Sequence, residues 1–510
     1  MIRQVAVLCS LLAVLSCAEW RESSALQDPV PEVGATETVA ERGQRLSLGT
    51  VLAGPPGDPA SHYAMGYARV LCSAIFVSGL EADFAAKNVG FFTSPPEKRR
   101  DIRDAAIDHD AMTVTVTTDT GIVRVARYIG DLGCVSLPIG ESSPYFEPPI
   151  IETTLADAAT IPWPMGDSPS QALSVVGVDS TKLDAALDVF FTEGALSAAT
   201  VVTVQGQIVA ERYGAGIRPH MPLESWSMGK SLTATLLGVL IQQGEYVLSQ
   251  PAPIPEWQAA GDPRQAIQIQ DILRMSSGLR CPSPYDPGGN SSADYFDHHY
   301  VYTGTVNAFA YAADRPQQWP PNTVGRYRNC DPVLANYLIR LAVEGRGDDY
   351  HQFPQTALFD KIGIRNLIFQ TDPFGNILLQ GSDLGTARDW ARLGNLYLNE
   401  GVARGERVLP EGFSDFVSAV APAWQADGRP VHGGFFWLEG ATYDRAPSAL
   451  YSMLGAGGQM AVIMPSKDLV VVRLGHSAGE AIWQSVKEDG MRLLLEAVPD
   501  KQMEQTTVDH

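Results

Sequence analysis

Two short stretches, AMTVTVTT (111–118) and IVRVARYIG (122–130), alternate apolar and polar residues, a period of two that is typical of β-strands. Four later stretches also predict strands: ATVVTVQGQIVAERYG (199–214), GGFFWLEG (433–440), GGQMAVIMP (457–465) and DLVVVRLG (468–475). Asp119-Thr120-Gly121 joins the first two stretches and Gln205-Gly206 lies inside the third, so both predict hairpin turns. Ser466-Lys467-Asp468 joins the last two.

The middle of the chain, roughly residues 225–409, shows helical periodicity broken by Pro- and Gly-rich loops. After Ser227, apolar residues recur at the spacing of one helix face: Leu232, Leu236, Leu237, Leu240 and Ile241. Gly244 provides an end for this helix, and a further helical segment is expected at 68–86. Strands at both ends that enclose a helical middle predict an α+β domain, with a sheet assembled from distant parts of the chain.

The length of 510 residues exceeds what one hydrophobic core usually organises, so two domains are expected. We expect a smaller mixed N-terminal domain of unassigned role at residues 43–148, a Pro-rich linker at 149–171, and the α+β domain at 172–498. Residues 1–18 have the form of a signal peptide, because an apolar run at 5–15 is too short to span a bilayer and ends in small residues. Export is therefore expected.

The end of this leader, Val14-Leu15-Ser16-Cys17, also resembles a bacterial lipobox. In that reading Cys17 carries a lipid that attaches the protein to a membrane. Simple cleavage of a signal peptide is the alternative. The expected location is the periplasm, either free or as a membrane-anchored lipoprotein.

The chain has six cysteines, and Cys9 and Cys17 lie in the leader, which leaves an even number. An even number in an exported protein favours disulfides. Proximity along the chain favours Cys72 with Cys134 and Cys281 with Cys330; buried free thiols are the alternative.

The composition is that of a globular protein, with 45% hydrophobic and 19% charged residues. The formal net charge is −21, from 37 basic and 58 acidic residues. Such an acidic balance argues against binding to nucleic acid or to anionic lipid. A small-molecule partner is expected instead.

Ser227-x-x-Lys230 is the candidate for chemistry, since both residues lie on one face of the first helical turn. The positive end of a helix and burial both disfavour a lysine cation, so Lys230 can become a base for the Ser227 hydroxyl. The Ser227 N–H would then donate to an oxyanion. The alternative is that Ser227 caps the helix and Lys230 is solvated, as in most isolated S-x-x-K sequences.

The surroundings of this motif resemble the β-lactamase-related serine hydrolases, which include class C β-lactamases, D-alanyl-D-alanine carboxypeptidases, esterases and 6-aminohexanoate-dimer hydrolase. Matching segments follow the order of that family: SWSMGKSLT (225–233), PAPIPEW (251–257), GDPRQAIQIQDILRMSSGL (261–279), GRYRNCDPVLANYLI (325–339), GSDLGTARDWARLGNLYLNEGV (381–402) and GGQMAVIMPSKDLVVVRLG (457–475). The resemblance covers residues 172–498 and implies a β-lactamase/penicillin-binding-protein-like fold, an antiparallel sheet with helices plus a helical subdomain. It also implies hydrolysis of an ester or amide through an acyl-enzyme, with no cofactor.

In that family a tyrosine of a Y-x-N motif shares the role of the base. Tyr327 and Tyr397 are both followed by such an asparagine. Tyr397 lies on a predicted helix that begins with a capping box at Thr386 and Asp389, where it is expected in the core. We therefore assign the role to Tyr327, with Asn329 orienting the substrate or the lysine.

The third family element is a K-T-G or H-x-G sequence that contacts the substrate and completes the oxyanion hole. Its place here is taken by Ala456-Gly457-Gly458, so the lysine or histidine is absent. The Gln459 N–H could still donate to an oxyanion, and Gly457 and Gly458 allow close approach. Loss of the cation favours an esterase or amidase over an enzyme that recognises a substrate carboxylate.

The segment ADYFDHHY contains Asp294, Asp297, His298 and His299, which could suggest a metal. The histidines lack the helical spacing of ligand pairs, so we expect surface loop residues and no metal. His476 could approach the site or serve structure. The rival functions are a non-catalytic binding protein on the same fold and an envelope lipoprotein whose N-terminal domain carries the function.

Overall fold

The computed structural model describes residues 37–501 except 52, 169–174, 288–294, 439–449 and 478–480. The expected leader, with Cys9 and Cys17, lies outside the described residues. No helix in the described part of the chain is long and apolar enough to cross a membrane.

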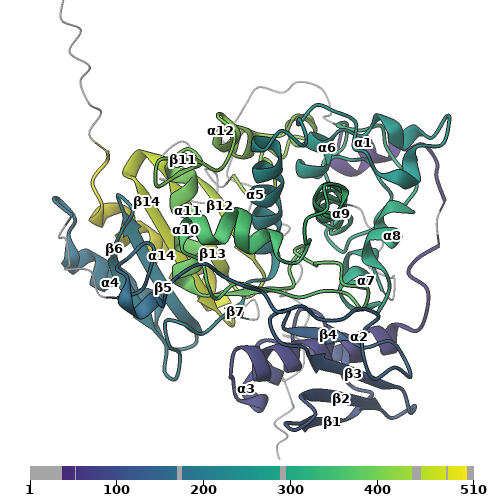
Figure 1. Ribbon diagram of the computed structural model, residues 1–510, viewed down its shortest axis with the longest axis horizontal. Helices are drawn as coiled ribbons and strands as arrows, with labels where there is room; N and C mark the ends of the chain where they lie inside the picture. The colour runs from purple at the N-terminus through teal and green to yellow at the C-terminus, as the bar shows by residue number, and fades with distance from the viewer. Residues whose placement is uncertain are drawn as a thin grey trace, which may run out of the picture.

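A five-stranded antiparallel sheet forms the left half of Figure 1. Its order is β12 (Tyr451–Gly455), β13 (Gln459–Met464), β14 (Leu469–Gly475), β5 (Ser197–Val204) and β6 (Gln207–Tyr213). Leu469 pairs with Val204, so the two ends of the α+β region meet at the centre of the sheet, as predicted. Both turns expected here, at Gln205-Gly206 and at residues 466–468, connect paired strands.

Helices cover both faces of this sheet. One face packs on α4 (Ser180–Phe190) and α14 (Ala481–Ala497), and the other on α11 (Ala387–Leu398). The Thr386 side chain accepts from the Asp389 N–H at the start of α11, as expected. Two apolar cores result, one on each side of the sheet.

The larger core continues into the helical half of the α+β region, in which α5 and α9 pack together (Figure 1). The helices here are α5 (Gly229–Gln242), α6 (Ile269–Leu273), α7 (Asp297–Thr303), α8 (Ala308–Ala313), α9 (Cys330–Gly345), α10 (Asp360–Ile362), α12 (Phe413–Ser418) and α13 (Pro422–Ala426). Short strands complete it: β7 (Leu223–Glu224), β9 (Asp383–Gly385) and β8 (Ile368–Phe369) form one small sheet, and β10 (Val402–Ala403) pairs with β11 (Glu406–Arg407). Gly244 has a φ of 86° just beyond α5, so the predicted stop is confirmed.

A second, smaller sheet lies below these helices in Figure 1. Its strands are β1 (Ile102–Asp108), β2 (Thr113–Thr118), β3 (Val123–Tyr128) and β4 (Cys134–Ser136). Helix α2 (Pro59–Cys72) packs on this sheet, and α3 (Ala82–Asn88) packs against α2. The hairpin predicted at residues 119–121 joins β2 to β3. We call residues 59–137 the N-terminal module. A Cys72–Cys134 disulfide ties α2 to β4 inside it.

Three expectations need correction or refinement. The segment 68–86 is not one helix, because a π-helical turn (Ser73–Val77) and a loop separate α2 from α3. Within 433–438, Trp437 makes only isolated bridges with His432 and Ser452 rather than a strand. The expected surface histidines lie in α7 and are largely buried.

The Pro-rich segment wraps the α+β region. Thr153 and Thr154 bond Asp360, and the Trp163 indole N–H donates to the Gly206 carbonyl over 2.6 Å. Helix α1 (Val39–Arg45), at the N-terminal end, also contacts the α+β region. The Trp319 indole N–H donates to the Gly43 carbonyl over 2.7 Å. The domain boundaries expected from the sequence stay a prediction.

Candidate active site

Ser227 occupies a tight turn between strand β7 and helix α5. A 3-10 turn (Trp226–Met228) runs directly into α5, and Ser227 is half-buried while its neighbours Trp226 and Met228 are buried. Trp226 has a φ of 52°, a left-handed conformation that costs a non-glycine residue about 1–3 kcal/mol. The surrounding packing must therefore stabilise this turn, in which Ser227 is more exposed than either neighbour.

Lys230 lies behind Ser227 and is only 2% exposed. Its Nζ donates to Ser227 Oγ over 3.0 Å and also to the Gln380 carbonyl. Burial lowers the pKa of Lys230 to about 7, although the charge of Asp383 acts in the opposite direction. A large fraction of Lys230 is then neutral near neutral pH, as a base for Ser227 must be.

Tyr327 joins this pair across the site. Its ring centroid lies 5.0 Å from Lys230 Nζ, and burial raises the pKa of the phenol while its interaction with the Ser227 hydroxyl lowers it. Tyr397 lies elsewhere: it is fully buried and its hydroxyl shares a 2.9 Å hydrogen bond with Thr235. The structure thus brings Ser227, Lys230 and Tyr327 together and leaves Tyr397 in the core.

Aromatic rings border Tyr327 on its outer side. Trp437 lies 5.0 Å and Tyr285 5.9 Å from the Tyr327 ring, measured between ring centroids. Tyr285 is 52% exposed and Trp437 is half-buried, so both rings keep exposed apolar surface beside Tyr327. Sequence inspection missed these rings because they come from two distant loops.

Asn329 is placed one residue before helix α9. Its Nδ2 donates to the His298 carbonyl over 2.6 Å, and its Oδ1 has no partner among the described residues. The amide therefore links the Tyr327 segment to α7.

The turn between β12 and β13 forms the facing wall. Gly457 and Gly458 have φ values of 82° and 77°, which only glycine adopts easily. The strand passes close to the nucleophile turn, since a β-carbon at Gly455 would overlap the Ser225 carbonyl oxygen. Ala456, which lies between Gly455 and Gly457, packs against the apolar core of the N-terminal module.

Polar side chains behind this turn are engaged with backbone groups. Arg473 donates to the carbonyls of Gly457 and Gly458 over 2.8 and 3.0 Å, and its guanidinium stacks 3.8 Å from the Trp483 ring centroid. The Gln459 side chain bonds both the N–H and the carbonyl of Gly475. These side chains hold the turn through hydrogen bonds to backbone groups. The groups of the turn that face the site are therefore those of the backbone.

Two buried acids close to the base escaped the sequence analysis. Asp383 lies against the start of α5, where a β-carbon at Gly229 would overlap its Oδ1. Glu224 lies on β7, opposite Leu384 of β9. Burial raises the pKa of both carboxyls well above the usual range; Lys230 opposes this for Asp383 and Arg69 opposes it for Glu224. Asp383 stands in GSDLGTARDW, a segment of the family resemblance, but no local pattern signals its proximity to Lys230.

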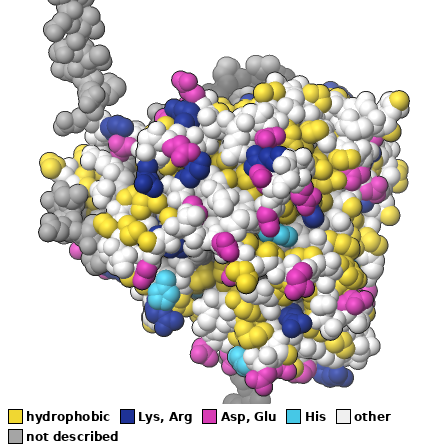
Figure 2. Space-filling view, in the orientation of Figure 1, with side chains coloured by type: hydrophobic (Ala, Val, Ile, Leu, Met, Phe, Trp, Pro, Cys, Tyr) yellow, Lys and Arg dark blue, Asp and Glu magenta, His cyan; other side chains and the backbone are white. Residues whose placement is uncertain are grey.

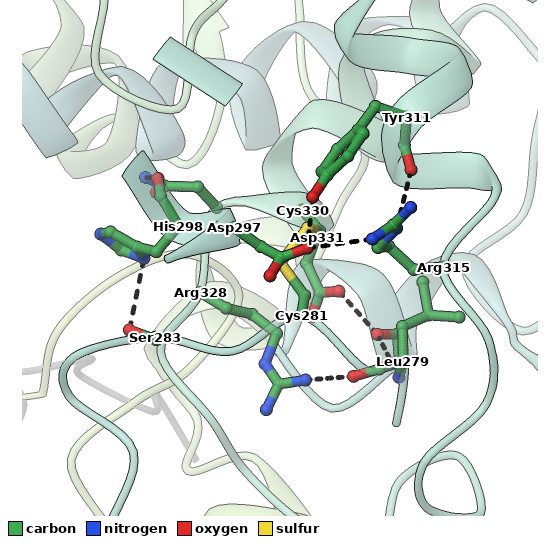
Figure 3. The surroundings of a disulfide bond; sticks show 12 residues. Leu279, Cys281, Ser283, Asp297, His298, Tyr311, Arg315, Arg328, Cys330 and Asp331 are labelled. Atoms are coloured by element: carbon green, nitrogen blue, oxygen red, sulfur yellow. Dashed lines mark hydrogen bonds and ion pairs between the residues drawn. A yellow bond between two sulfur atoms is a disulfide. The ribbon is translucent and has the colours of Figure 1, made fainter. Parts of the chain in front are cut away.

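The Cys281–Cys330 disulfide joins the start of α9 to the segment that follows α6 (Figure 3). Cys330 is the first residue of α9 and closely follows Tyr327. Arg328 donates to the Leu279 carbonyl, and Ser277 donates to Asp331 over 2.6 Å. The bridge and these bonds fix the Tyr327 segment to the loop that precedes it, as the cysteine pairing predicted.

The Asp297-His298-His299 cluster has structural partners. Asp297 accepts from Tyr311 over 2.6 Å and pairs with Arg315 at 3.1 Å (Figure 3). Burial lowers the pKa of His299 to about 4 and also holds that of His298 well below its usual range. Among the described residues, no group of three or more His, Cys, Asp or Glu is placed to hold a metal, and Asp294 lies outside them. His476 packs on Phe84, with 5.2 Å between ring centroids.

Comparison with known proteins yields one family and several relatives. The model of the Beta-lactamase family matches residues 183–486. The 6-aminohexanoate-dimer hydrolase of Paenarthrobacter ureafaciens is 26% identical over 238 residues, which cover 42% of this chain and 55% of that protein. The match thus spans about half the length of this relative.

Solved structures show similarity over the same region. A putative 6-aminohexanoate-dimer hydrolase from Bacillus anthracis is 20% identical with a TM-score of 0.49, and the match covers 60% of this chain and 81% of that chain. A putative beta-lactamase from Bacteroides dorei DSM 17855 is 18% identical with a TM-score of 0.49, over 62% and 99% of the two chains.

Proposed function

Because the chain belongs to the Beta-lactamase family, we propose that it is a serine hydrolase that cleaves an ester or amide through an acyl-enzyme. One observation carries the proposal: the Nζ of a buried lysine whose pKa is lowered to about 7 lies 3.0 Å from the hydroxyl oxygen of a half-buried serine. A structural lysine at a helix start would be solvated and would keep its charge.

In the proposed reaction, neutral Lys230 takes the proton of Ser227 as Oγ attacks the substrate carbonyl carbon. The carbonyl oxygen gains negative charge, which the Ser227 N–H and the backbone of the β12–β13 turn would stabilise, with Gly457, Gly458 and Gln459 as the residues of that turn. The proton taken by Lys230 passes through the Tyr327 hydroxyl to the leaving group, which departs as an alcohol or amine. Water then attacks the acyl carbon and gives a proton to Lys230, which returns it to Ser227 Oγ as the carboxylic acid leaves.

The proposed substrate is a neutral small molecule with an apolar portion. Ala456 stands where the family places a lysine or histidine, so this wall supplies no cation for a substrate carboxylate. Trp437 and Tyr285 beside Tyr327 supply apolar contact surface. Asn329 would orient the substrate or Lys230. The proposal includes no cofactor and no nucleic acid; acidic and basic side chains are interspersed on the face in Figure 2.

The two disulfides suggest an oxidising environment outside the cytoplasm. Together with the leader sequence, they support the proposal that the protein is exported to the periplasm. Attachment through a lipid on Cys17 is the proposed alternative to free release.

The test is exposure of the folded protein to a fluorophosphonate probe, beside turnover of p-nitrophenyl esters, small amides and a chromogenic cephalosporin. We expect labelling of Ser227, turnover of the esters or amides, and little turnover of the cephalosporin. Ser227→Ala is the control for labelling, and Tyr397→Phe is the control for general damage. A wild-type protein that neither labels nor turns over any ester or amide would favour the non-catalytic binding protein or the envelope lipoprotein instead.

A further inference from the structure

The N-terminal module lies outside the family match, which begins at residue 183, yet it contacts the nucleophile turn directly. Trp226, next to Ser227, is buried in the apolar core of the module. Its indole packs against Phe92 with 4.8 Å between ring centroids. Ser78 of the module donates to the Pro222 carbonyl over 2.7 Å, shortly before the turn. The module therefore packs directly against the turn that carries Ser227.

Arg69, on helix α2 of the module, extends across this boundary. It is only 4% exposed. Its guanidinium donates to the Tyr302 carbonyl over 3.0 Å, to Gln370 Oε1 over 3.2 Å and to the Thr371 carbonyl over 3.4 Å. All three acceptors are neutral and belong to the α+β region. Through these three hydrogen bonds, Arg69 joins the N-terminal module to the α+β region.

Arg69 also faces the acid at the base of the turn. Arg69 and Glu224 line one small cavity of about 10 Å³, roughly the room of one water molecule, together with Trp226 and Tyr302. The positive charge of Arg69 lowers the pKa of Glu224 against the effect of burial, and Glu224 in turn raises that of Arg69. Glu224 ends strand β7, just before the turn.

Tyr302 links Arg69 to the conformation of Trp226. The Tyr302 ring packs edge-to-face against the Trp226 indole, with 6.4 Å between ring centroids. The Tyr302 hydroxyl donates to the Gln380 carbonyl over 3.1 Å. The Gln380 carbonyl is also an acceptor for Lys230. Phe92 and Tyr302 thus both contact the indole whose backbone has an unfavourable φ, and Arg69 fixes the Tyr302 backbone.

The module is fastened where this contact is made. Cys72 follows Arg69 by one helical turn on α2, and its disulfide to Cys134 ties that end of α2 to β4. Arg69 therefore lies on a helix whose end is held in place by a disulfide.

We propose that the N-terminal module is a working part of the catalytic centre, in which Arg69 and Phe92 are positioning residues that hold the turn carrying Ser227. The kinetic part of this inference rests on the proposed hydrolase function; the structural part does not. Neither residue touches the aromatic side of the site, so substrate binding should be little affected. Loss of either should instead displace Ser227 from Lys230 and slow the chemical step.

The experiment compares four variants of the full-length protein: Arg69→Met, Arg69→Lys, Phe92→Ala and Arg99→Met. Arg99 is the matched control, because its guanidinium bonds the carbonyls of Ser94 and Ala86 within the module. Two readouts are taken: kcat and KM for p-nitrophenyl butyrate, and the hydrogen exchange rate of the peptide that spans residues 223–232.

We expect Arg69→Met and Phe92→Ala to lower kcat by about 10- to 100-fold while KM changes by less than about 2-fold. Exchange at 223–232 should become faster in both. Arg69→Lys keeps the charge and should recover part of kcat, and Arg99→Met should match the wild type in both readouts.

Unchanged kcat and exchange in Arg69→Met, or equal losses in Arg99→Met, would overturn the inference. If Arg69→Met fails to fold, the milder Phe92→Ala decides in the same way. If the wild type turns over no ester and does not label at Ser227, the proposed function fails; the exchange rates then decide by themselves whether the module holds the turn.

Discussion

The two walls of the site are built on different physical principles. The wall formed by α5 and the Tyr327 segment presents buried titratable side chains, and Lys230 is the clearest case because burial lowers its pKa to about 7. The facing wall, at the β12–β13 turn, presents backbone, since Arg473 and Gln459 are bound behind it. In the proposed reaction, one wall activates the nucleophile, and the other stabilises the oxyanion without selecting a charged substrate.

This difference separates reaction type from substrate. Acyl transfer needs a nucleophile, a base and oxyanion donors, and backbone N–H groups can serve as the donors. Recognition of a carboxylate needs a cation, and Ala456 provides none. The experiments below address the two walls separately.

The largest effect is expected at the base. Lys230→Met should lower kcat/KM by about 10³-fold, because it removes the amine that lies 3.0 Å from Ser227 Oγ, and burial raises the pKa of the Tyr327 phenol that also interacts with this hydroxyl. The same variant should be more stable at pH 7, by on the order of 2 kcal/mol, since it removes a buried ionisable group. Ester hydrolysis and urea unfolding measure the two changes; a variant that retains activity would exclude Lys230 as the base.

Tyr327→Phe should lower kcat/KM by about 10²-fold, because the phenol beside Lys230 and Ser227 would no longer relay a proton. Its counterpart is Tyr397→Phe, which removes the hydrogen bond to Thr235 in the core and should cost about 1 kcal/mol of stability with activity intact. Parallel kinetics and thermal unfolding distinguish the two tyrosines. The reverse pattern would transfer the role to Tyr397.

The pH dependence should report the lowered pKa of Lys230. Activity should rise about 10-fold per pH unit below a midpoint near 7, because only neutral Lys230 is a base. His432 and His298 lie nearby but remain neutral there, since burial lowers their pKa values, that of His432 to about 3. The midpoint belongs to Lys230 coupled to Asp383, so Asp383→Asn should move it to lower pH.

The same shift has a consequence for stability. The folded pKa of Lys230, about 7, lies below its ordinary value of 10.5, so the unfolded chain binds more protons between these pH values. The contribution of Lys230 to stability should therefore rise as pH increases from 7 to 10.5. The stability advantage of Lys230→Met should shrink over that window, and an advantage independent of pH would contradict the assigned shift.

The smallest effect is expected at the facing wall. Ala456→Lys should improve kcat/KM for an ester that bears a carboxylate, relative to a neutral ester, by about 5-fold, which is the strength of a partly exposed ion pair. Ala456→Met is the matched control, with a side chain of similar length and no charge. Equal changes for both esters in Ala456→Lys would show that this position does not face the substrate.

Local patterns sufficed for much of the fold. The hairpins between β2 and β3 and between β5 and β6 were predictable because alternation and turn residues both act over short distances. The pairing of Ser227 with Lys230 was predictable for a similar reason, since a spacing of three places side chains on one helix face. The disulfides followed from proximity along the chain.

The rest depends on contacts between distant segments. Asp383 reaches Lys230, and Arg69 reaches the Ser227 turn, only through the packing of separate elements, for which no local signal exists. His298 illustrates the converse: its neighbourhood in the sequence suggested a surface loop, but α7 buries it beneath Tyr327. The strand expected at residues 433–440 does not form over its described part, 433–438, for another reason, since Trp437 forms only single bridges while it packs on Tyr327.

In the proposed reaction, Ser227 becomes acylated during turnover. Mass spectrometry of the quenched enzyme, taken in the steady state with a slowly hydrolysed ester, tests it directly. We expect the mass of one acyl group on the peptide that contains Ser227, lost when the ester is exhausted and absent from Ser227→Ala. Turnover by Ser227→Ala at the wild-type rate, or turnover by the wild type with an adduct only on another residue, would contradict the claim.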